Sequence, residues 1–373
     1  MLYDINKKNE GVNMTRSYKF IIYPNKSQEE LIQRTFHCSL FVYNHFLSRR
    51  IDEYKNNKKN LGYNLCSKEL TELKKRFSWL CSVDKWALQN SLKNLDSAYQ
   101  RFFKCGAGFP KFKKESATRK SYRTTSNNNN IECVGGKIKL PKLGWVRFRD
   151  NIKGISYKIL NATISQVPSG KYYCSICFEI QNSCGNTGNK SIGIDVGVSD
   201  YAVLSNGDKI ENPKYMKSFH QKIIMLSRRF SKKKEDSKNR EKARIKLARA
   251  WEKLSNKRKD FIHKLTKELI SRYDVLCIET LDIESMKRKH RISSLICDAS
   301  WYEFSRQLKY KAETVGKTVL SADKFFPSSQ LCSNCGYKND DIKDLSIRFW
   351  KCPVCHEIHD RDINAAKNLL SIM

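Results

Sequence analysis

The chain has 373 residues, with 71 lysines and arginines against 38 aspartates and glutamates, so its formal net charge is +33. This length allows two or three domains with a substantial core. Such a positive balance favours a polyanionic partner, and nucleic acid is the first candidate. An anionic membrane is the other possible partner, but no apolar run approaches the roughly 18 residues that span a bilayer. The composition therefore predicts a nucleic-acid partner and no membrane association.

The start of the chain, MLYDINKKNEGVNMTRS, is polar and carries no secretory signal. Residues 1–14 are expected to form a tail ahead of the first strand. The 14 cysteines could indicate a secreted disulfide scaffold, but they are scattered singly except for three CxxC pairs. Of these, Cys174 and Cys177 lie on a strand-like alternation and are predicted to be core residues. We therefore expect a reducing cytoplasm.

The first half of the chain changes pattern three times. Residues 15–24 alternate like a strand and end at Pro24-Asn25. From residue 27 to about residue 103, apolar residues return at three- and four-residue spacing, which predicts a helical bundle. Ser27 and Glu30 are expected to form the capping box of its first helix. From Gly106 onwards, short strands are broken by glycine, proline and asparagine. Residues 181–190 are polar and rich in Gly and Asn, which predicts a linker between domains.

The second half alternates strands with helices. An apolar strand, SIGIDVG, precedes a hairpin in which Asn206-Gly207 is expected to form a type I′ turn. Residues 221–264 predict one long helix with 17 basic against 5 acidic residues. This helix is either a solvated face or a contact with a phosphate backbone, and the one-sided excess favours the contact. A buried parallel strand (YDVLCIET), a helix over 293–316 and a strand (TVLSADKFF) follow.

Two CxxC pairs near the C-terminus are separated by sixteen residues. Four thiolates at this spacing can surround one tetrahedral Zn²⁺ from two facing turns. Two disulfides or free core cysteines are the alternative, but Gly336 and Pro353 stand where such turns need them. The predicted zinc ligands are Cys332, Cys335, Cys352 and Cys355.

Three carboxylates interrupt or end apolar segments. Asp195 lies in IGIDVG, Glu279 ends VLCIET, and Asp362 precedes INAAKNLL. A buried carboxylate needs a partner, so each acid could cap a helix or pair with a cation. Three in this order instead suggest oxygen ligands for Mg²⁺ or Mn²⁺. Two such ions about 4 Å apart can drive phosphodiester hydrolysis. Asp360 competes for the third place, and we expect it to be a cap or an outer group.

Further pieces of the sequence point to a family. They are GIDVGVSDYAVLSNG, LSNKRKDFIHKLT, IETLDI, DASWYEFSRQLKYKA, CSNCG, CPVCH, HDRDINAAKNL and, near the front, YKFIIYPNKSQEELI, FVYNHFL and GFPKFKK. Together they resemble the TnpB (OrfB) proteins of bacterial insertion sequences, the compact relatives of type V CRISPR nucleases. The resemblance extends from Thr15 to Leu370.

The resemblance implies an α+β multidomain protein. An N-terminal β-barrel (15–26 and 105–180) would be interrupted by a helical bundle (27–104), and the linker 181–190 would follow. An RNase H-like (RuvC) α/β nuclease domain (191–326 and 357–373) would carry an inserted zinc ribbon (327–356). The acidic motifs of this domain map onto Asp195, Glu279 and Asp362.

The resemblance also implies a function in the bacterial cytoplasm. The chain would hold a guide RNA transcribed from the element's end. With two Mg²⁺ (or Mn²⁺) and one structural Zn²⁺ it would cleave double-stranded target DNA beside a short adjacent motif. Two alternatives are an RNA-guided regulator that does not cleave and a transposase that acts directly on DNA ends. The oligomeric state is left open.

Several aromatic and basic residues are candidates for nucleic-acid contacts, because rings stack on bases and cations neutralise phosphates. Phe109 and Phe112 are equally compatible with core positions in the barrel. Tyr122, Arg123 and Thr124 are placed near the adjacent-motif reader by resemblance alone. The predicted contact residues are Tyr18, Lys19, Phe109, Lys111, Lys113, Tyr122, Arg123, Thr124, Arg258 and Lys264.

Overall fold

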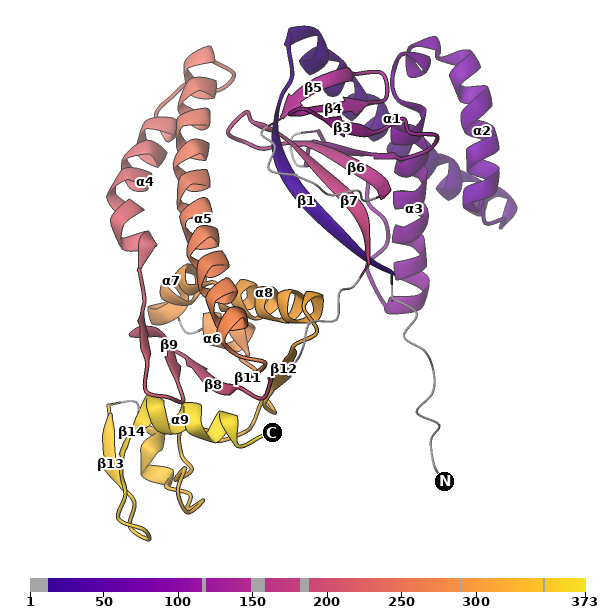
Figure 1. Ribbon diagram of the computed structural model, residues 1–373. Helices are drawn as coiled ribbons and strands as arrows, with labels where there is room; N and C mark the ends of the chain where they lie inside the picture. The colour runs from indigo at the N-terminus through magenta and orange to yellow at the C-terminus, as the bar shows by residue number, and fades with distance from the viewer. Residues whose placement is uncertain (1–12, 116–118, 149–157, 182–187, 289, 345) are drawn as a thin grey trace, which may run out of the picture. The chain divides into compact units, whose positions relative to one another are not determined.

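The computed structural model describes residues 13–115, 119–148, 158–181, 188–288, 290–344 and 346–373 (Figure 1). The chain divides into two compact units, Met1–Gln181 and Asn182–Met373. The division falls at the first residue of the predicted linker, of which residues 182–187 lie outside the described ranges, as does most of the predicted tail. No helix in the described ranges is both long and apolar enough to cross a membrane.

The first unit contains a seven-stranded antiparallel sheet in the order β2-β6-β7-β1-β5-β4-β3. Its strands are β1 (Asn13–Tyr23), β2 (Ser121–Thr125), β3 (Glu132–Val134), β4 (Lys137–Leu140), β5 (Gly144–Phe148), β6 (Lys158–Gln166) and β7 (Tyr172–Gln181). Within the described residues β2 and β3 do not pair with each other, so the expected closed barrel is not confirmed. Of the two cysteines predicted to be core residues, Cys174 lies fully buried in the core beneath this sheet, whereas Cys177 is half-buried.

Three helices interrupt the sheet between β1 and β2. They are α1 (Lys26–Asn57), α2 (Tyr63–Arg76) and α3 (Lys85–Cys105), with a short 3₁₀ turn, η1 (Ser78–Ser82), before α3. The helices share a core of their own, and α3 packs against α1 and β2. The capping box of α1 differs from the prediction. Asn25 is the N-cap and pairs reciprocally with Gln28, at 2.9 and 3.0 Å, so the helix begins before Ser27.

The second unit contains a mixed five-stranded sheet in the order β10-β9-β8-β11-β12. The strands are β8 (Ser191–Val196), β9 (Asp200–Leu204), β10 (Lys209–Glu211), β11 (Val275–Ile278) and β12 (Thr318–Ser321). β8, β9 and β10 pair antiparallel, whereas β11 runs parallel to both β8 and β12.

The turn between β9 and β10 is not the predicted type I′ turn, because Asn206 does not have the positive φ that such a turn requires. Instead, the turn closes with a Gly207 N–H to Leu204 carbonyl bond, and only Gly207 has a positive φ, of 94°.

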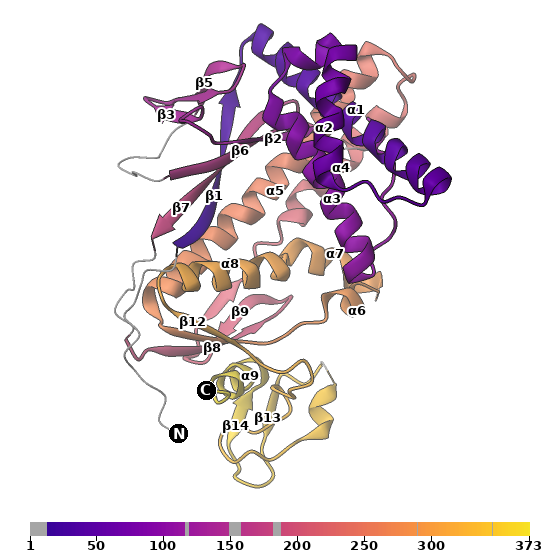
Figure 2. The same ribbon diagram turned by 90° about the vertical axis from the view of Figure 1, so that its right-hand side faces the viewer.

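Helices cover both faces of this sheet (Figure 2). α5 (Lys238–Arg272), α7 (His290–Ala299) and α8 (Trp301–Thr314) share the core on one face. α9 (Arg361–Leu370) packs against β8 on the other. The remaining helices are α4 (Tyr215–Ser231) and α6 (Ile283–Arg288).

Two segments predicted as single helices are each broken. Residues 221–264 form parts of the antiparallel pair α4 and α5, because Asp236 adopts a positive φ of 55° and Ser237 caps a new helix through the N–H of Arg240. Residues 293–316 divide into α7 and α8 at Ser300, whose φ is 56°.

A small segment with two CxxC turns lies between β12 and α9, and it extends past the predicted ribbon, which ends at residue 356. It contains η2 (Asp340–Lys343) and a two-stranded sheet of β13 (Phe349–Lys351) and β14 (Ile358–Asp360). Its core is made of Cys332, Cys352, Ile342 and Trp350.

Candidate metal centres and nucleic-acid surface

Asp195 and Glu279 lie side by side at the ends of two neighbouring parallel strands. The register of β8 and β11 pairs Ile194 with Ile278, and each carboxylate follows directly after its isoleucine. Ile192, Ile194, Leu276 and Ile278 are buried, which fixes both strands in the sheet. Two acids that are 84 residues apart in the sequence therefore lie next to each other at the carboxyl ends of neighbouring strands.

Asp362 reaches the same edge from α9. Gly193 lies against the backbone of α9, where an added Cβ would overlap the carbonyl oxygen of Ala366. Asp362 lies one helical turn before Ala366, in the first turn of α9. Asp360 caps the helix, accepting hydrogen bonds from the N–H groups of Asp362 (3.0 Å) and Ile363 (3.2 Å). The role predicted for Asp360 as a cap is thus confirmed.

Asp195, Glu279 and Asp362 are close enough for their charges to interact. Burial raises the pKa of Asp195 well above its usual range, and the charges of Glu279 and Asp362 raise it further. Burial also raises the pKa of Glu279 to about 7. Crowded, partly dehydrated carboxylates of this kind suit a hard divalent cation, which restores their ionised form. The carboxylate of Asp362 also lies 3.5 Å from Nη1 of Arg348.

The four predicted zinc ligands come from two turns with the same hydrogen-bond pattern. In the first, the Gly336 N–H donates to the Cys332 carbonyl and the Cys332 N–H to the Tyr337 carbonyl. In the second, His356 and Glu357 make the equivalent bonds with Cys352. The residue after the second cysteine of each pair has a positive φ, 77° at Gly336 and 58° at His356.

The arrangement of the thiols fits one tetrahedral zinc ion. All four Sγ atoms lie within 4.8 Å of one another. The Cys332–Cys355 and Cys335–Cys352 pairs are 3.5 and 3.6 Å apart, close to the ~3.8 Å that Zn–S bonds of about 2.3 Å imply. A hydrogen bond from the Glu357 backbone lowers the pKa of Cys355 to about 6, which favours its thiolate, whereas burial raises the pKa of Cys332 to about 12.

One face of α9 holds this ribbon. Asn364 accepts from the Ser333 N–H (2.9 Å) and donates to the Leu331 carbonyl (2.6 Å). Asn368 donates to the carbonyls of Ser328 and Leu331, both at 2.7 Å. Because Asp362 belongs to the same helix, the ribbon and the carboxylate site share one rigid element.

The predicted nucleic-acid contacts on β1 and just after α3 range from exposed to half-buried. Lys19 is exposed, with its Nζ 4.3 Å from the centre of the Tyr173 ring. Tyr18 is half-buried and packs edge-on against Phe178. Phe109 and Phe112 are 46% and 55% exposed, so the interpretation as core residues is not supported.

The basic residues near Phe109 have two environments. Lys111 is exposed. Lys113 is half-buried and its Nζ lies 3.7 Å from the centre of the Tyr43 ring, and burial lowers its pKa. Asn44 fixes the backbone of Lys113 through two hydrogen bonds of 2.9 Å.

The three residues placed near the adjacent-motif reader alternate across β2. Tyr122 and Thr124 are buried, at 6% and 0% exposure, whereas Arg123 between them is exposed. A cavity of about 110 Å³ between α1, α3 and β2 is lined by Arg123 and Lys113, among others. Arg123 is the exposed residue of the three. Tyr122 also lines this cavity, whereas Thr124 is fully buried and does not reach it.

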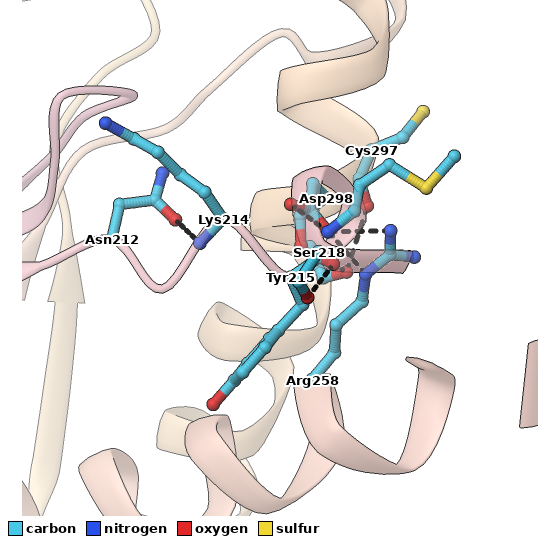
Figure 3. A network of polar contacts seen from close by, with 9 residues as sticks. Asn212, Lys214, Tyr215, Ser218, Arg258, Cys297 and Asp298 are labelled. Atoms are coloured by element: carbon cyan, nitrogen blue, oxygen red, sulfur yellow. Dashed lines mark hydrogen bonds and ion pairs between the residues drawn. The ribbon is translucent and has the colours of Figure 1, made fainter. Parts of the chain in front are cut away.

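Arg258 also differs from the prediction. Its Nε and Nη2 lie 2.7 and 2.6 Å from Oδ1 of Asp298, which is nearly buried (Figure 3). The same carboxylate accepts the backbone N–H of Met216 at 2.9 Å, at the start of α4. Arg258 thus joins α5 to α4 and α7 inside the unit. Lys264 remains exposed and pairs with Asp260 at 2.8 Å.

The sequence analysis assigned a phosphate contact to the basic 221–264 helix as a whole, but it did not single out a row of cations on α5. Four exposed residues follow one another at spacings of four, three and four residues, and within the described part of the chain none of them makes an ion pair. They are Lys242, Lys246, Arg249 and Lys253. The regular spacing was the available signal. Asn364 and Asn368, four residues apart on α9, could have been found in the same way.

Comparisons with known proteins agree with this geometry. Residues 175–290 match the OrfB family of the IS605 type, described as "Probable transposase". Residues 301–369 match a family described as "Cas12f1-like, TNB domain". Residues 14–59 match one described as "Helix-turn-helix domain", although here that range holds one strand and one helix, β1 and α1.

Among solved structures, the chain resembles that of the Cas12f1-sgRNA-target DNA complex, with a TM-score of 0.62 at 13% identity, covering 96% of this chain and 98% of that one. The protein thus has a Cas12f1-like α/β fold of mixed sheets and helices.

Curated relatives are similar over nearly the whole chain. A "Putative RNA-guided DNA endonuclease" of Streptomyces pristinaespiralis is 30% identical, covering 95% of this chain and 89% of that protein. "Putative RNA-guided DNA endonuclease InsQ" of Escherichia coli is 31% identical, covering 95% and 92%. The chain belongs to the TnpB (OrfB) family.

Proposed function

We propose that this protein is an RNA-guided DNA endonuclease of a transposable element, active in the bacterial cytoplasm. The observation that carries the proposal is the meeting of Asp195, Glu279 and Asp362 at one edge of the β8–β12 sheet. The names of the relatives, which share most of the chain's length, support the same activity. A guide RNA from the element's end and a double-stranded target with a short adjacent motif are the proposed partners.

In this proposal the three carboxylates hold two Mg²⁺ ions, or Mn²⁺. When bound, such ions activate a water molecule and stabilise the leaving oxygen of a phosphodiester. The chain's own part is to fix the ligands: the register of β8 and β11 sets Asp195 against Glu279. Asp360 caps α9 and is itself held by Lys209 at 2.7 Å, which orients the helix turn that carries Asp362.

The proposed zinc centre stabilises the ribbon rather than reacting. Structural zinc sites contribute folding free energy directly. Because Asn364 and Asn368 connect the ribbon to α9 by hydrogen bonds, a stable ribbon also holds α9, and therefore Asp362, in place.

The proposed domain organisation follows the predicted ranges. A β domain (15–26 and 105–180) with an inserted helical bundle (27–104) binds RNA and DNA, and a nuclease domain (191–326 and 357–373) with its ribbon (327–356) cuts. Exposed rings and cations at Phe109 and Lys111 are suited to stacking and phosphate contact. Arg123, beside the cavity between α1, α3 and β2, is proposed to contact the adjacent motif.

The α5 row supports the nucleic-acid assignment in the second unit. Four cations that form no ion pair with the described residues lie within the twelve residues 242–253, which span about 16 Å of helix. A backbone of regularly spaced phosphates is a matching partner, since each neutralised phosphate releases counterions.

The test is cleavage by the full chain purified with its co-expressed element-end RNA, which is first sequenced. A plasmid carrying the matching target beside a library of adjacent motifs is offered with Mg²⁺. We expect cleavage by the wild type, and none by Asp195→Asn, while Asp208→Asn, an exposed acid in the β9–β10 turn, remains active.

Other outcomes decide between the alternatives. Guided binding without cleavage by the wild type would favour the regulator. Joining of element ends without guide RNA, in a strand-transfer assay, would favour a transposase. Either result overturns the proposed endonuclease.

A further inference from the structure

His359 occupies a position that the four-cysteine site does not require. It lies in β14, 5% exposed, with its Nε2 3.0 Å from Sγ of Cys332, which is itself 1% exposed. Its ring packs against Trp350 with the centroids 4.8 Å apart. Trp350 is its partner across the β13–β14 ladder, so both the backbone and the ring of His359 are fixed.

The chemistry of the contact between His359 and Cys332 depends on whether the four cysteines bind a zinc ion. Four thiolates complete the tetrahedral coordination of a structural zinc ion, so a histidine is not needed as a fifth ligand. A metal-bound thiolate keeps lone pairs that accept hydrogen bonds, and a neutral imidazole carries one N–H donor. With the proton on Nε2, His359 donates to the sulfur of Cys332.

His359 is also placed between the zinc site and the carboxylate site. The next residue, Asp360, caps α9, and Asp362 lies in the first turn of that helix. Asn364, also in α9, accepts a hydrogen bond from the N–H of Ser333, the residue that follows Cys332 in the first cysteine turn. In the described part of the chain no hydrogen bond joins residues 352–357, the second cysteine turn, to α9.

We propose that His359 is an outer partner of the zinc site, a positioning residue whose Nε2–H donates to the Cys332 thiolate. It thereby strengthens zinc binding and ties zinc occupancy to the placement of α9. This role rests on the proposed zinc centre, but not on the nuclease activity. Hydrogen bonds to metal ligands orient them and tune the metal, and their loss weakens binding about 10–100-fold.

Two substitutions separate the hydrogen bond from packing. His359→Phe keeps a ring against Trp350 but removes the donor, and His359→Gln keeps a donor without the ring. His356→Asn is the control, because His356 is exposed in the second cysteine turn and Asn tolerates its positive φ. All are made in the full-length chain.

Zinc affinity is measured by competition with a chelator, without RNA or DNA. We expect His359→Phe to bind zinc about 10–100-fold more weakly, His359→Gln to recover most of the affinity, and His356→Asn to match the wild type. In the cobalt-substituted protein, the sulfur-to-cobalt charge-transfer band of His359→Phe should move to longer wavelength, because the thiolate loses its hydrogen bond.

Three results would overturn the proposal. One is a His359→Phe variant with wild-type zinc affinity and an unchanged cobalt spectrum. Another is a wild-type cobalt spectrum showing nitrogen coordination that is lost in His359→Phe, which would make His359 a ligand. The third is a wild-type chain that binds no zinc. None of these depends on DNA cleavage, so failure of the proposed nuclease activity would be seen separately.

Discussion

Gly193 of β8 lies directly against the carbonyl oxygen of Ala366 in α9, with no room for a side chain between them. Because β8 carries Asp195 and α9 carries Asp362, this contact sets how close the two carboxylates come. A glycine in a strand interior usually weakens the strand, and one reason to keep it is close approach of another backbone.

Gly193→Ala is expected to displace α9. The added methyl group must move the helix or the strand, at about 1–3 kcal/mol of the free energy of unfolding, and Asp362 moves with the helix. We expect little or no DNA cleavage with guide-RNA binding retained, checked by nuclease and RNA-binding assays on the same preparation. Gly62→Ala is the control, since nothing lies within 4 Å of its added Cβ. Full cleavage by Gly193→Ala would contradict this role of the contact.

The carboxylate site was open to prediction because its signals are local. Asp195 and Glu279 each end a short apolar strand, and strand ends on one edge of a parallel sheet are neighbours. The sequence also distinguished the roles of Asp360 and Asp362, because only Asp362 falls within the first turn of the predicted helix. The cap of α1 shows where this fails, because Asn25/Gln28 and Ser27/Glu30 offer two polar pairs two residues apart, and propensity alone does not choose between them.

Arg258 illustrates a limit set by distance along the chain. In the sequence it is one of many cations on a basic helix, whereas Asp298, its partner, is 40 residues later. Such a pair depends on how three helices pack, which no local pattern encodes. Tyr122 and Thr124 show the related limit for strands: alternation indicates that both face one side of β2, but not that this side is the core.

Arg258→Met is expected to destabilise the fold without altering nucleic-acid contacts. It leaves the carboxylate of Asp298 buried and unpaired, a change that costs about 3–5 kcal/mol. Thermal unfolding should shift accordingly, and the double variant Arg258→Met/Asp298→Asn should regain part of the loss because the buried charge is gone. A variant that keeps wild-type stability but binds RNA or DNA more weakly would restore Arg258 as a contact residue.

Loss of the α5 row should weaken nucleic-acid binding without lowering stability, the opposite of the effect expected for Arg258→Met. Replacing Lys242, Lys246, Arg249 and Lys253 with glutamine removes four exposed charges and breaks no ion pair between described residues. We expect little change in thermal stability, and a slope of log affinity against log salt concentration that is smaller by about 2–4. Filter-binding or fluorescence titrations across a salt series measure this. A slope equal to that of the wild type would show that the row is only a solvated face.

Zinc removal is expected to disable the carboxylate site from a distance. Cys352→Ser deletes one of four ligands, so zinc should be lost and the ribbon should loosen, since metal binding supplies folding free energy. Metal analysis, hydrogen exchange over α9 and cleavage test the three steps in turn. Cys81→Ser, at an exposed cysteine outside the ribbon, is the control. Unchanged zinc content together with full cleavage in Cys352→Ser would refute the coupling.

The pKa of Glu279 gives the metal-free protein a specific pH dependence. Burial raises this pKa from 4.5 to about 7, so the folded state disfavours the ionised carboxylate. Below about pH 4.5 the group is protonated in both the folded and unfolded states and costs nothing. As the pH rises from about 4.5 to about 7, stability on the order of 3 kcal/mol is lost, because the unfolded state ionises before the folded state.

Glu279→Gln cannot ionise and should escape that loss. In EDTA, we expect the variant to gain stability relative to the wild type as the pH is raised from 4.5 to 8, measured by urea unfolding at each pH. Mg²⁺ should close the gap by stabilising the wild type alone, because a cation favours ionised ligands and the amide is a weaker one. Parallel stability curves for the two proteins across this range would show that Glu279 is not the buried, mutually repelled acid that a shared metal site requires.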